Sequence, residues 1–239
     1  MNKDLFIRAI RIDWDRIDES SYVRNIDALQ GLHELAFDRP VTFFAGENGS
    51  GKSTLLEAIA IARGFNPEGG TKNYSFSTYH SHSELYDAVR LVRGVRREAY
   101  GYFLRAESFY NVATAEEEYS KGPNGVPMHY HERSHGESFL KLVQQNFGPD
   151  GLYILDEPEA ALSPQRQLTL LIEICRCVKG GAQFIIATQS PILLGLPNAR
   201  ILSFNGGPVH PCAYEETDSY RVTRMYIDHR EEMLKRLLE

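Results

Sequence analysis

Residues 46–53 combine closely spaced glycines with a lysine and a serine, a set of residue types suited to holding phosphate. They read Gly-Glu-Asn-Gly-Ser-Gly-Lys-Ser and match the pattern G-x-x-x-x-G-K-[ST]. Glycines let successive backbone N–H groups close around phosphate oxygens, and the start of a following helix favours negative charge. In such a loop Lys52 adds positive charge for the β- and γ-phosphates, and the Ser53 hydroxyl suits a magnesium ion. The alternative is a glycine-rich turn without function.

Two adjacent carboxylates, Asp156 and Glu157, follow the apolar run 152–155. In open parallel sheets, ligands bind outside the carboxyl ends of the strands. We therefore expect Asp156 to hold magnesium, directly or through water. We expect Glu157 to act as general base on an attacking water, a role worth about 10²–10⁴-fold in rate. A solvated turn is the alternative interpretation of this pair.

The segments around these residues predict alternating strands and helices. Strands are expected at 6–12, 41–45, 88–92, 100–104, 152–155 and 183–188, and helices at 53–63, 108–120, 137–147, 165–178 and 218–239. Ser163 and Pro164 suit the cap and first turn of one of these helices. Apolar strands that alternate with helices favour an α/β fold with a mainly parallel sheet covered on both faces.

With these motifs the chain resembles the ABC-type P-loop ATPases. The runs GENGSGKST and LYILDEP look like Walker A and Walker B, and residues 156–163 are similar to Walker B plus the D-loop. The likeness spans 41–191 and is to stand-alone bacterial ATPases related to the heads of SMC, RecF-type and OLD proteins. It implies an ABC-ATPase-like head with an N-terminal β subdomain and a helical signature lobe. We expect one domain, 1–239, with 1–74 and 148–239 as the nucleotide-binding lobe and 75–147 as the second lobe.

The resemblance also implies ATP and Mg²⁺ as cofactors and assigns roles to residues. The loop residues expected to contact ATP are Gly46, Glu47, Asn48, Gly49, Ser50, Gly51, Lys52, Ser53 and Thr54. Ser134 and Gly136 match the serine and glycine of the family signature LSGGQ, while His135 and Glu137 replace its second glycine and its glutamine. Ser134, Gly136 and Glu137 would therefore face the γ-phosphate held by a second subunit. A capped helix start without function is the alternative.

Two departures from the family pattern bear on the rate of hydrolysis and on coupling to partners. Gln189 stands where the family's switch histidine contacts the γ-phosphate; glutamine can hydrogen-bond there but cannot carry a proton. The catalytic set is therefore Glu157, Lys52 and Gln189. No glutamine occurs between Gln30 and Gln144, so the family's Q-loop glutamine is missing, and we expect a residue within 75–84 to replace it. This argues against a transporter subunit, as does the lack of a membrane-length apolar run.

The motifs and the resemblance leave three functional hypotheses open. The first is ATP hydrolysis by a nucleotide-sandwiched homodimer; the second is a slow, nucleotide-gated module that acts through a partner protein. The third is a DNA-acting repair or defence ATPase, although a net charge of −6 disfavours general nucleic-acid binding. Five arginines, Arg90, Arg93, Arg96, Arg97 and Arg105, could contact DNA phosphates or form an exposed face. Arg105 could instead lie near a nucleotide phosphate.

The remaining residues give weaker indications. Tyr22 or Trp14 could stack on adenine, or simply pack in the core. The three cysteines, Cys175, Cys177 and Cys212, are expected to be reduced thiols, and no signal-peptide or membrane segment is recognised, so we expect a cytoplasmic protein without membrane contact. The closely spaced histidine pairs at 80 and 82 and at 129 and 131 are interpreted as solvated loop residues.

Overall fold

The computed structural model describes residues 5–67, 69–71, 84–106, 109 and 135–238. Its core is a six-stranded sheet with the strand order β5-β6-β7-β3-β8-β9. These strands are β3 (Val41–Ala45), β5 (Tyr100–Arg105), β6 (Gly151–Asp156), β7 (Gln183–Thr188), β8 (Arg200–Ser203) and β9 (His210–Pro211). All neighbours run parallel except β8 and β9. The chain therefore has the α/β architecture of a P-loop NTPase, as expected.

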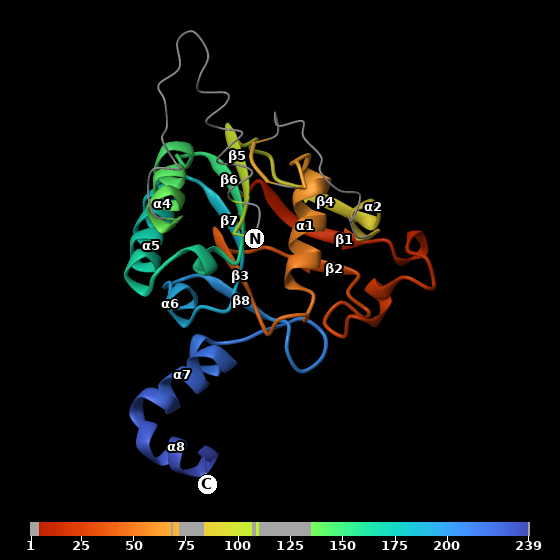
Figure 1. The fold of residues 1–239 in the computed structure, drawn as a ribbon. Helices are drawn as coiled ribbons and strands as arrows, with labels where there is room; N and C mark the ends of the chain where they lie inside the picture. Colours follow the sequence, from red (N-terminus) through yellow and green to blue (C-terminus); the bar gives the residue numbers. More distant parts are fainter. Residues whose placement is uncertain (1–4, 68, 72–83, 107–108, 110–134, 239) are drawn as a thin grey trace.

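Helices cover both faces of this sheet (Figure 1). On one face lies α1 (Lys52–Arg63); on the other lie α4 (His135–Asn146), α5 (Pro164–Lys179) and α6 (Pro191–Leu194). Successive residues of β6 alternate between the two faces: Leu152 and Ile154 pack on the α1 side, and Tyr153 and Leu155 on the other. Because both faces are buried, the strand reads as a continuous apolar run, which is the pattern that predicted it.

A second, antiparallel sheet has the order β2-β1-β4 and packs beside α1. Its strands are β1 (Ile7–Ile12), β2 (Glu34–Ala36) and β4 (Val89–Arg93). The buried amide of Gln183, at the start of β7, joins this sheet to the core. Its Oε1 accepts from the backbone N–H groups of Phe6 and Ile7, both at 2.9 Å, and its Nε2 donates to the Ile7 carbonyl at 2.8 Å.

The predicted strands and helices near the site are confirmed to within a few residues. Two strands of the expected second lobe, 75–147, belong to the sheets: β4 pairs with β1, and β5 pairs with β6. In the same segment, α4 packs on α5. The helix predicted at 108–120 lies outside the described residues apart from Phe109. The division of the chain into two lobes stays a prediction.

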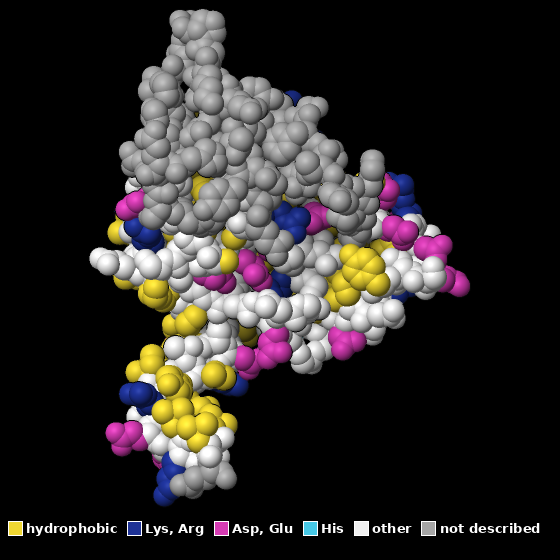
Figure 2. All heavy atoms as spheres, viewed as in Figure 1, with side chains coloured by type: hydrophobic (Ala, Val, Ile, Leu, Met, Phe, Trp, Pro, Cys, Tyr) yellow, Lys and Arg dark blue, Asp and Glu magenta, His cyan; other side chains and the backbone are white. Residues whose placement is uncertain are grey.

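The predicted C-terminal helix consists of two helices, α7 (Asp218–Asp228) and α8 (Arg230–Leu238), which form a helical arm away from the body (Figure 1). Neither helix contains a buried residue, and Figure 2 shows hydrophobic side chains gathered on the arm. Val222 and Ile227 are among its exposed apolar side chains. Within the described ranges, no helix has the length and apolar character needed to cross a membrane.

Candidate nucleotide site

The glycine-rich loop joins the end of β3 to the start of α1, the context that the motif requires. Gly51 caps the helix with a φ of 96°, a left-handed conformation that favours glycine. A Cβ at this position would also meet Cγ2 of Ile26 at 2.5 Å. The backbone can therefore turn tightly into α1 only with glycine here, and the turn aims the first N–H groups of the helix into the loop.

The Lys52 side chain is 3% exposed and lies within this loop. Its Nζ donates to the Glu47 carbonyl at 2.7 Å. Burial lowers the pKa of the Lys52 amine, while the charges of Glu157, Asp156, Glu159 and Glu47 oppose this shift. An anion in the loop would relieve the cost of burying the ammonium, which suits phosphate binding.

The two predicted magnesium ligands lie in contact. Oγ of Ser53 donates to Oδ1 of Asp156 at 2.8 Å. Hydroxyl and carboxylate oxygens are the ligands that Mg²⁺ prefers, and it usually takes one or two protein ligands with water and substrate phosphates for the rest. Among the described residues there is no group of three or more His, Cys, Asp or Glu that could hold a metal. A magnesium ion shared with phosphates does not need one, so this pair fits it.

Arg105, at the end of β5, lies beside Asp156 because the two residues are in register on adjacent strands. Its Nη1 contacts Oε2 of Glu57 at 2.7 Å, and its Nε lies 3.6 Å from Oδ2 of Asp156. The expected substitute for the Q-loop glutamine, within 75–84, lies outside the described residues except Glu84. The structure instead places Arg105 next to the predicted magnesium ligand.

Glu157 directly follows β6 and has a φ of 48°, which is uncommon outside glycine. Its backbone N–H donates to the Ala187 carbonyl at 2.9 Å. The Gln189 amide lies between Glu157 and the loop: its Nε2 donates to Oδ1 of Asn48 and, at 3.4 Å, to Oε1 of Glu157. The predicted base and switch residue therefore come together next to the loop.

A cleft of about 710 Å³ brings most of the predicted residues together. It is lined by Tyr22, Ile26, Asn48, Gly49, Gly51, Lys52, Ser53, Thr54, Arg105, Ala106, Asp156, Glu157 and Ala160. Tyr22 is 57% exposed there, so this aromatic ring is available to a ligand. Trp14 does not line the cleft; its Nε1 donates to the Leu32 carbonyl at 3.0 Å. The structure thus favours Tyr22 over Trp14 as the residue that could stack on a base.

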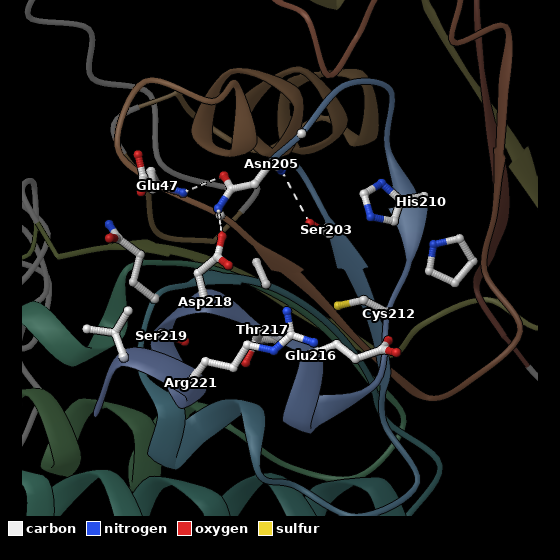
Figure 3. Close-up of a pocket in the computed structure, with 16 residues that line it drawn as sticks. Glu47, Ser203, Asn205, His210, Cys212, Glu216, Thr217, Asp218, Ser219 and Arg221 are labelled. Atoms are coloured by element: carbon white, nitrogen blue, oxygen red, sulfur yellow. Dashed lines mark hydrogen bonds between the residues drawn. The ribbon is translucent and has the colours of Figure 1, made fainter. Parts of the chain in front are cut away.

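Gly46 and Glu47 line a second hollow, of about 600 Å³, between the loop and the start of α7 (Figure 3). Asn205 spans this region. Its Oδ1 accepts from the Glu47 N–H at 2.9 Å, and its Nδ2 donates to Oδ2 of Asp218 at 2.8 Å, as the dashed lines in Figure 3 show. Asn205 therefore ties the glycine-rich loop to the helical arm. The sequence contained no signal for this bond.

Gly136 and Glu137, the two signature positions that the structure describes, do not line the cleft of their own chain. Gly136 and Glu137 lie in the first turn of α4. A Cβ on Gly136 would meet the Ala161 carbonyl at 2.9 Å, and Glu137 pairs with Nη2 of Arg166 at 3.0 Å. These residues pack on the segment that follows Glu157 and on α5. Ser134 lies outside the described residues.

The five arginines do not form one cluster. Arg93, Arg96 and Arg97 share a hollow of about 460 Å³ beside β4, whereas Arg105 lies in the cleft. Arg96 pairs with the Asp150 carboxylate, and this reduces the charge of the group. Arg105 therefore does not belong to the exposed face expected for the five arginines, because β4 and β5 belong to different sheets.

Two sequence families match the chain, in adjacent parts. A model described as "AAA domain" matches 22–127, and one described as "AAA domain, putative AbiEii toxin, Type IV TA system" matches 139–195. Among curated proteins, none matches. Similar solved structures include cbiO1 from Clostridium perfringens, part of the ABC transporter complex cbiONQ, at 15% identity and a TM-score of 0.47, covering 95% of this chain and 97% of that chain. The SMC head domain from Thermotoga maritima is 13% identical with a TM-score of 0.46, covering 87% of this chain and all of that chain.

Proposed function

We propose that this chain is a P-loop ATPase of the ABC/SMC-like type, which binds ATP with Mg²⁺ and hydrolyses the ATP to ADP and phosphate. The observation that carries the proposal is the contact between Ser53 and Asp156 at 2.8 Å, in the same cleft as Lys52 and Glu157. These four side chains supply what phosphoryl transfer to water needs: phosphate binding, magnesium ligands and a base.

Each residue has one role in this proposal. Lys52 and the backbone N–H groups of residues 46–54 bind the phosphates, as in other loops of this pattern. Ser53 and Asp156 would hold a magnesium ion, which would neutralise negative charge on the phosphates. Glu157 takes a proton from water as the water oxygen bonds to the γ-phosphorus. The bond to the β–γ bridging oxygen then breaks, and ADP leaves.

We propose further that two copies close around ATP. Gly136 and Glu137, in the first turn of α4, do not line the cleft of their own chain, and the N-terminus of a twelve-residue helix suits a phosphate. A second copy could bring this turn to the γ-phosphate, together with Ser134. The three free cysteines agree with a cytoplasmic location.

The test uses Glu157→Gln, which removes the base but keeps the shape of the side chain. Hydrolysis should fall by about 10²–10⁴-fold. With Mg²⁺ and ATP the variant should have a solution mass near twice 27.1 kDa, and with ADP a mass near 27.1 kDa. Glu34→Gln on β2 is the matched control and should behave as wild type. A monomer that holds ATP would contradict the homodimer and point to a partner chain; wild-type rates in Glu157→Gln would contradict the role of the base.

Gln189 supports a second candidate, a nucleotide-gated module that hydrolyses ATP very slowly. Its amide reaches both Asn48 and Glu157 but cannot carry a proton. Gln189→His separates the two functions in a turnover measurement. A large rise above the wild-type rate supports a module with damped hydrolysis, and an unchanged rate shows that this position does not limit turnover.

A further inference from the structure

A second carboxylate, Glu159, lies two residues after the proposed base and contacts the switch segment. It belongs to the 3₁₀ turn Pro158–Ala161. Its Oε1 accepts from the backbone N–H of Gln189 at 2.6 Å and from that of Ser190 at 3.2 Å. One carboxylate oxygen thus receives two consecutive N–H groups from the end of β7.

The Gln189 side chain extends from this segment toward the glycine-rich loop and the proposed base. From a backbone held by Glu159, the Gln189 amide extends to Oδ1 of Asn48 in the glycine-rich loop and to Oε1 of Glu157. A backbone bond from Glu157 to the Ala187 carbonyl, at 2.9 Å, joins the same two segments. The end of β7 and the residues after it are therefore linked both to the backbone of the proposed base and to Glu159, two residues later.

Gln167 of α5 supports the neighbouring residue but does not reach Gln189. Its Oε1 accepts from the Ser190 hydroxyl, and its Nε2 donates to the Leu162 carbonyl at 3.2 Å. The Ser190 hydroxyl in turn accepts from Ile192 and Leu193, at the start of α6. Gln167 thus fixes the side chain of Ser190, whereas the Gln189 N–H has Glu159 as its acceptor.

We propose that Glu159 is a positioning residue for hydrolysis: its carboxylate oxygen holds the Gln189 backbone so that the Gln189 amide bridges Asn48 and Glu157. The proposal rests on the proposed ATPase function and adds a residue to it. Glu159 does not line the cleft, so it acts through Gln189 rather than on nucleotide. The required property is an acceptor oxygen at the right reach, not a negative charge.

Two conservative variants separate reach from charge. Glu159→Gln keeps an acceptor oxygen at the same distance and removes the charge, whereas Glu159→Asp keeps the charge on a side chain shorter by one methylene. We expect Glu159→Gln to keep kcat within about threefold of wild type. We expect Glu159→Asp to lower kcat by about 10–100-fold with KM changed less than threefold, because small misplacements of catalytic groups have effects of this size. Glu159→Asp combined with Gln189→Ala should be no slower than Gln189→Ala alone.

Amide hydrogen exchange gives a readout that does not depend on turnover. In Glu159→Asp, the Gln189 amide should exchange at least about tenfold faster than in wild type, since it loses its acceptor. The Ser190 amide also donates to Oγ1 of Thr188 at 3.0 Å, so its exchange should change less. Amides of β3 should be unchanged, which shows that the variant is folded. Glu159→Gln should keep both amides protected, and Glu34→Gln, on the antiparallel sheet, should match wild type in all measurements.

Two results would overturn the proposal: wild-type protection of the Gln189 amide in Glu159→Asp, or low kcat in Glu159→Gln with the Gln189 amide protected. The second result would show that the charge matters rather than the position. If the wild-type protein does not hydrolyse ATP, the proposed function fails. Hydrogen exchange of the Gln189 amide still decides whether Glu159 holds the switch segment.

Discussion

The Ser53 hydroxyl donates to Oδ1 of Asp156 at 2.8 Å, although the two residues are 103 positions apart in the chain. Ser53 is in the first turn of α1 and Asp156 ends β6, so the contact depends on α1 packing over the carboxyl end of that strand. The fold thus holds the two proposed magnesium ligands together. Preformed ligands reduce the ordering that binding requires.

Removing the Ser53 hydroxyl should weaken ATP binding only when magnesium is present. Loss of one bond to a charged partner is worth about 1.5–3 kcal/mol, so we expect Ser53→Ala to raise the Kd for Mg·ATP at least about tenfold. The Kd for ATP in EDTA should change little, because Lys52 is intact. Calorimetric titration measures both values, and Ser53→Thr is the control that keeps a hydroxyl. Equal weakening with and without magnesium would show that Ser53 is not a magnesium ligand.

Replacing Gln183 should destabilise the protein without touching the cleft. Gln183→Leu leaves the buried N–H groups of Phe6 and Ile7 without their acceptor. Each unsatisfied group costs about 1–3 kcal/mol, so the free energy of unfolding should fall by about 2–5 kcal/mol. Urea denaturation measures this. Gln165→Leu, at an exposed position of α5, should stay within about 0.5 kcal/mol of wild type. A similar loss of unfolding free energy in both variants would show that the hydrogen bonds of the Gln183 amide do not account for the loss.

Gly136→Ala should also destabilise the protein, although alanine favours helices by about 1 kcal/mol over glycine. The added Cβ would lie 2.9 Å from the Ala161 carbonyl, a backbone atom that cannot swing aside. We expect a net loss of about 1–3 kcal/mol in urea denaturation, the usual range for overpacking. Gly148→Ala is the control, because its Cβ would meet nothing within 4 Å. A stabilised Gly136→Ala would show that α4 can shift away from Ala161.

The stability of Glu159→Gln should differ from wild type in a pH-dependent way. Burial raises the pKa of the Glu159 carboxyl above its usual 4.5, while hydrogen bonds from Thr188 and Gln189 oppose the shift. As pH rises above about 4.5, the unfolded wild-type chain loses this proton first, so folded wild type loses stability until the pH passes the raised pKa. Glutamine has no such proton. The free energy of unfolding of Glu159→Gln minus that of wild type should therefore grow as the pH rises above about 4.5, and become constant above the raised pKa of Glu159, in urea denaturation. A difference independent of pH would contradict the raised pKa.

Much of the site could be predicted because its chemistry is local in sequence. Residues 46–53 and 156–157 each sit where an apolar strand ends, and such contiguous patterns need no knowledge of tertiary contacts. The same patterns predicted β3, β6 and β7, since strands buried on both faces are apolar throughout. The short strands β2, β8 and β9 were missed because they have too few residues to show a period.

The bonds that could not be predicted join a side chain to backbone far along the chain. Asn205 binds the Glu47 N–H, and Gln183 binds Phe6 and Ile7, at separations of more than 150 residues. A single polar residue in the sequence looks the same whether it faces solvent or satisfies buried backbone. Likewise, the separation of Arg105 from the other arginines depends on the chain passing from one sheet to the other between β4 and β5.

The Asn205 side chain links the helical arm to the glycine-rich loop by two hydrogen bonds. Asp218, which it binds, is the first residue of α7, an eleven-residue helix that spans about 16 Å. A tilt of α7 by about 5° about its first residue would displace its far end by about 1.4 Å. The end of α8, which follows α7, would be displaced further. Asn205 links the first residue of α7 to the backbone of Glu47, so a small shift of that backbone is expected to displace the end of the arm by more.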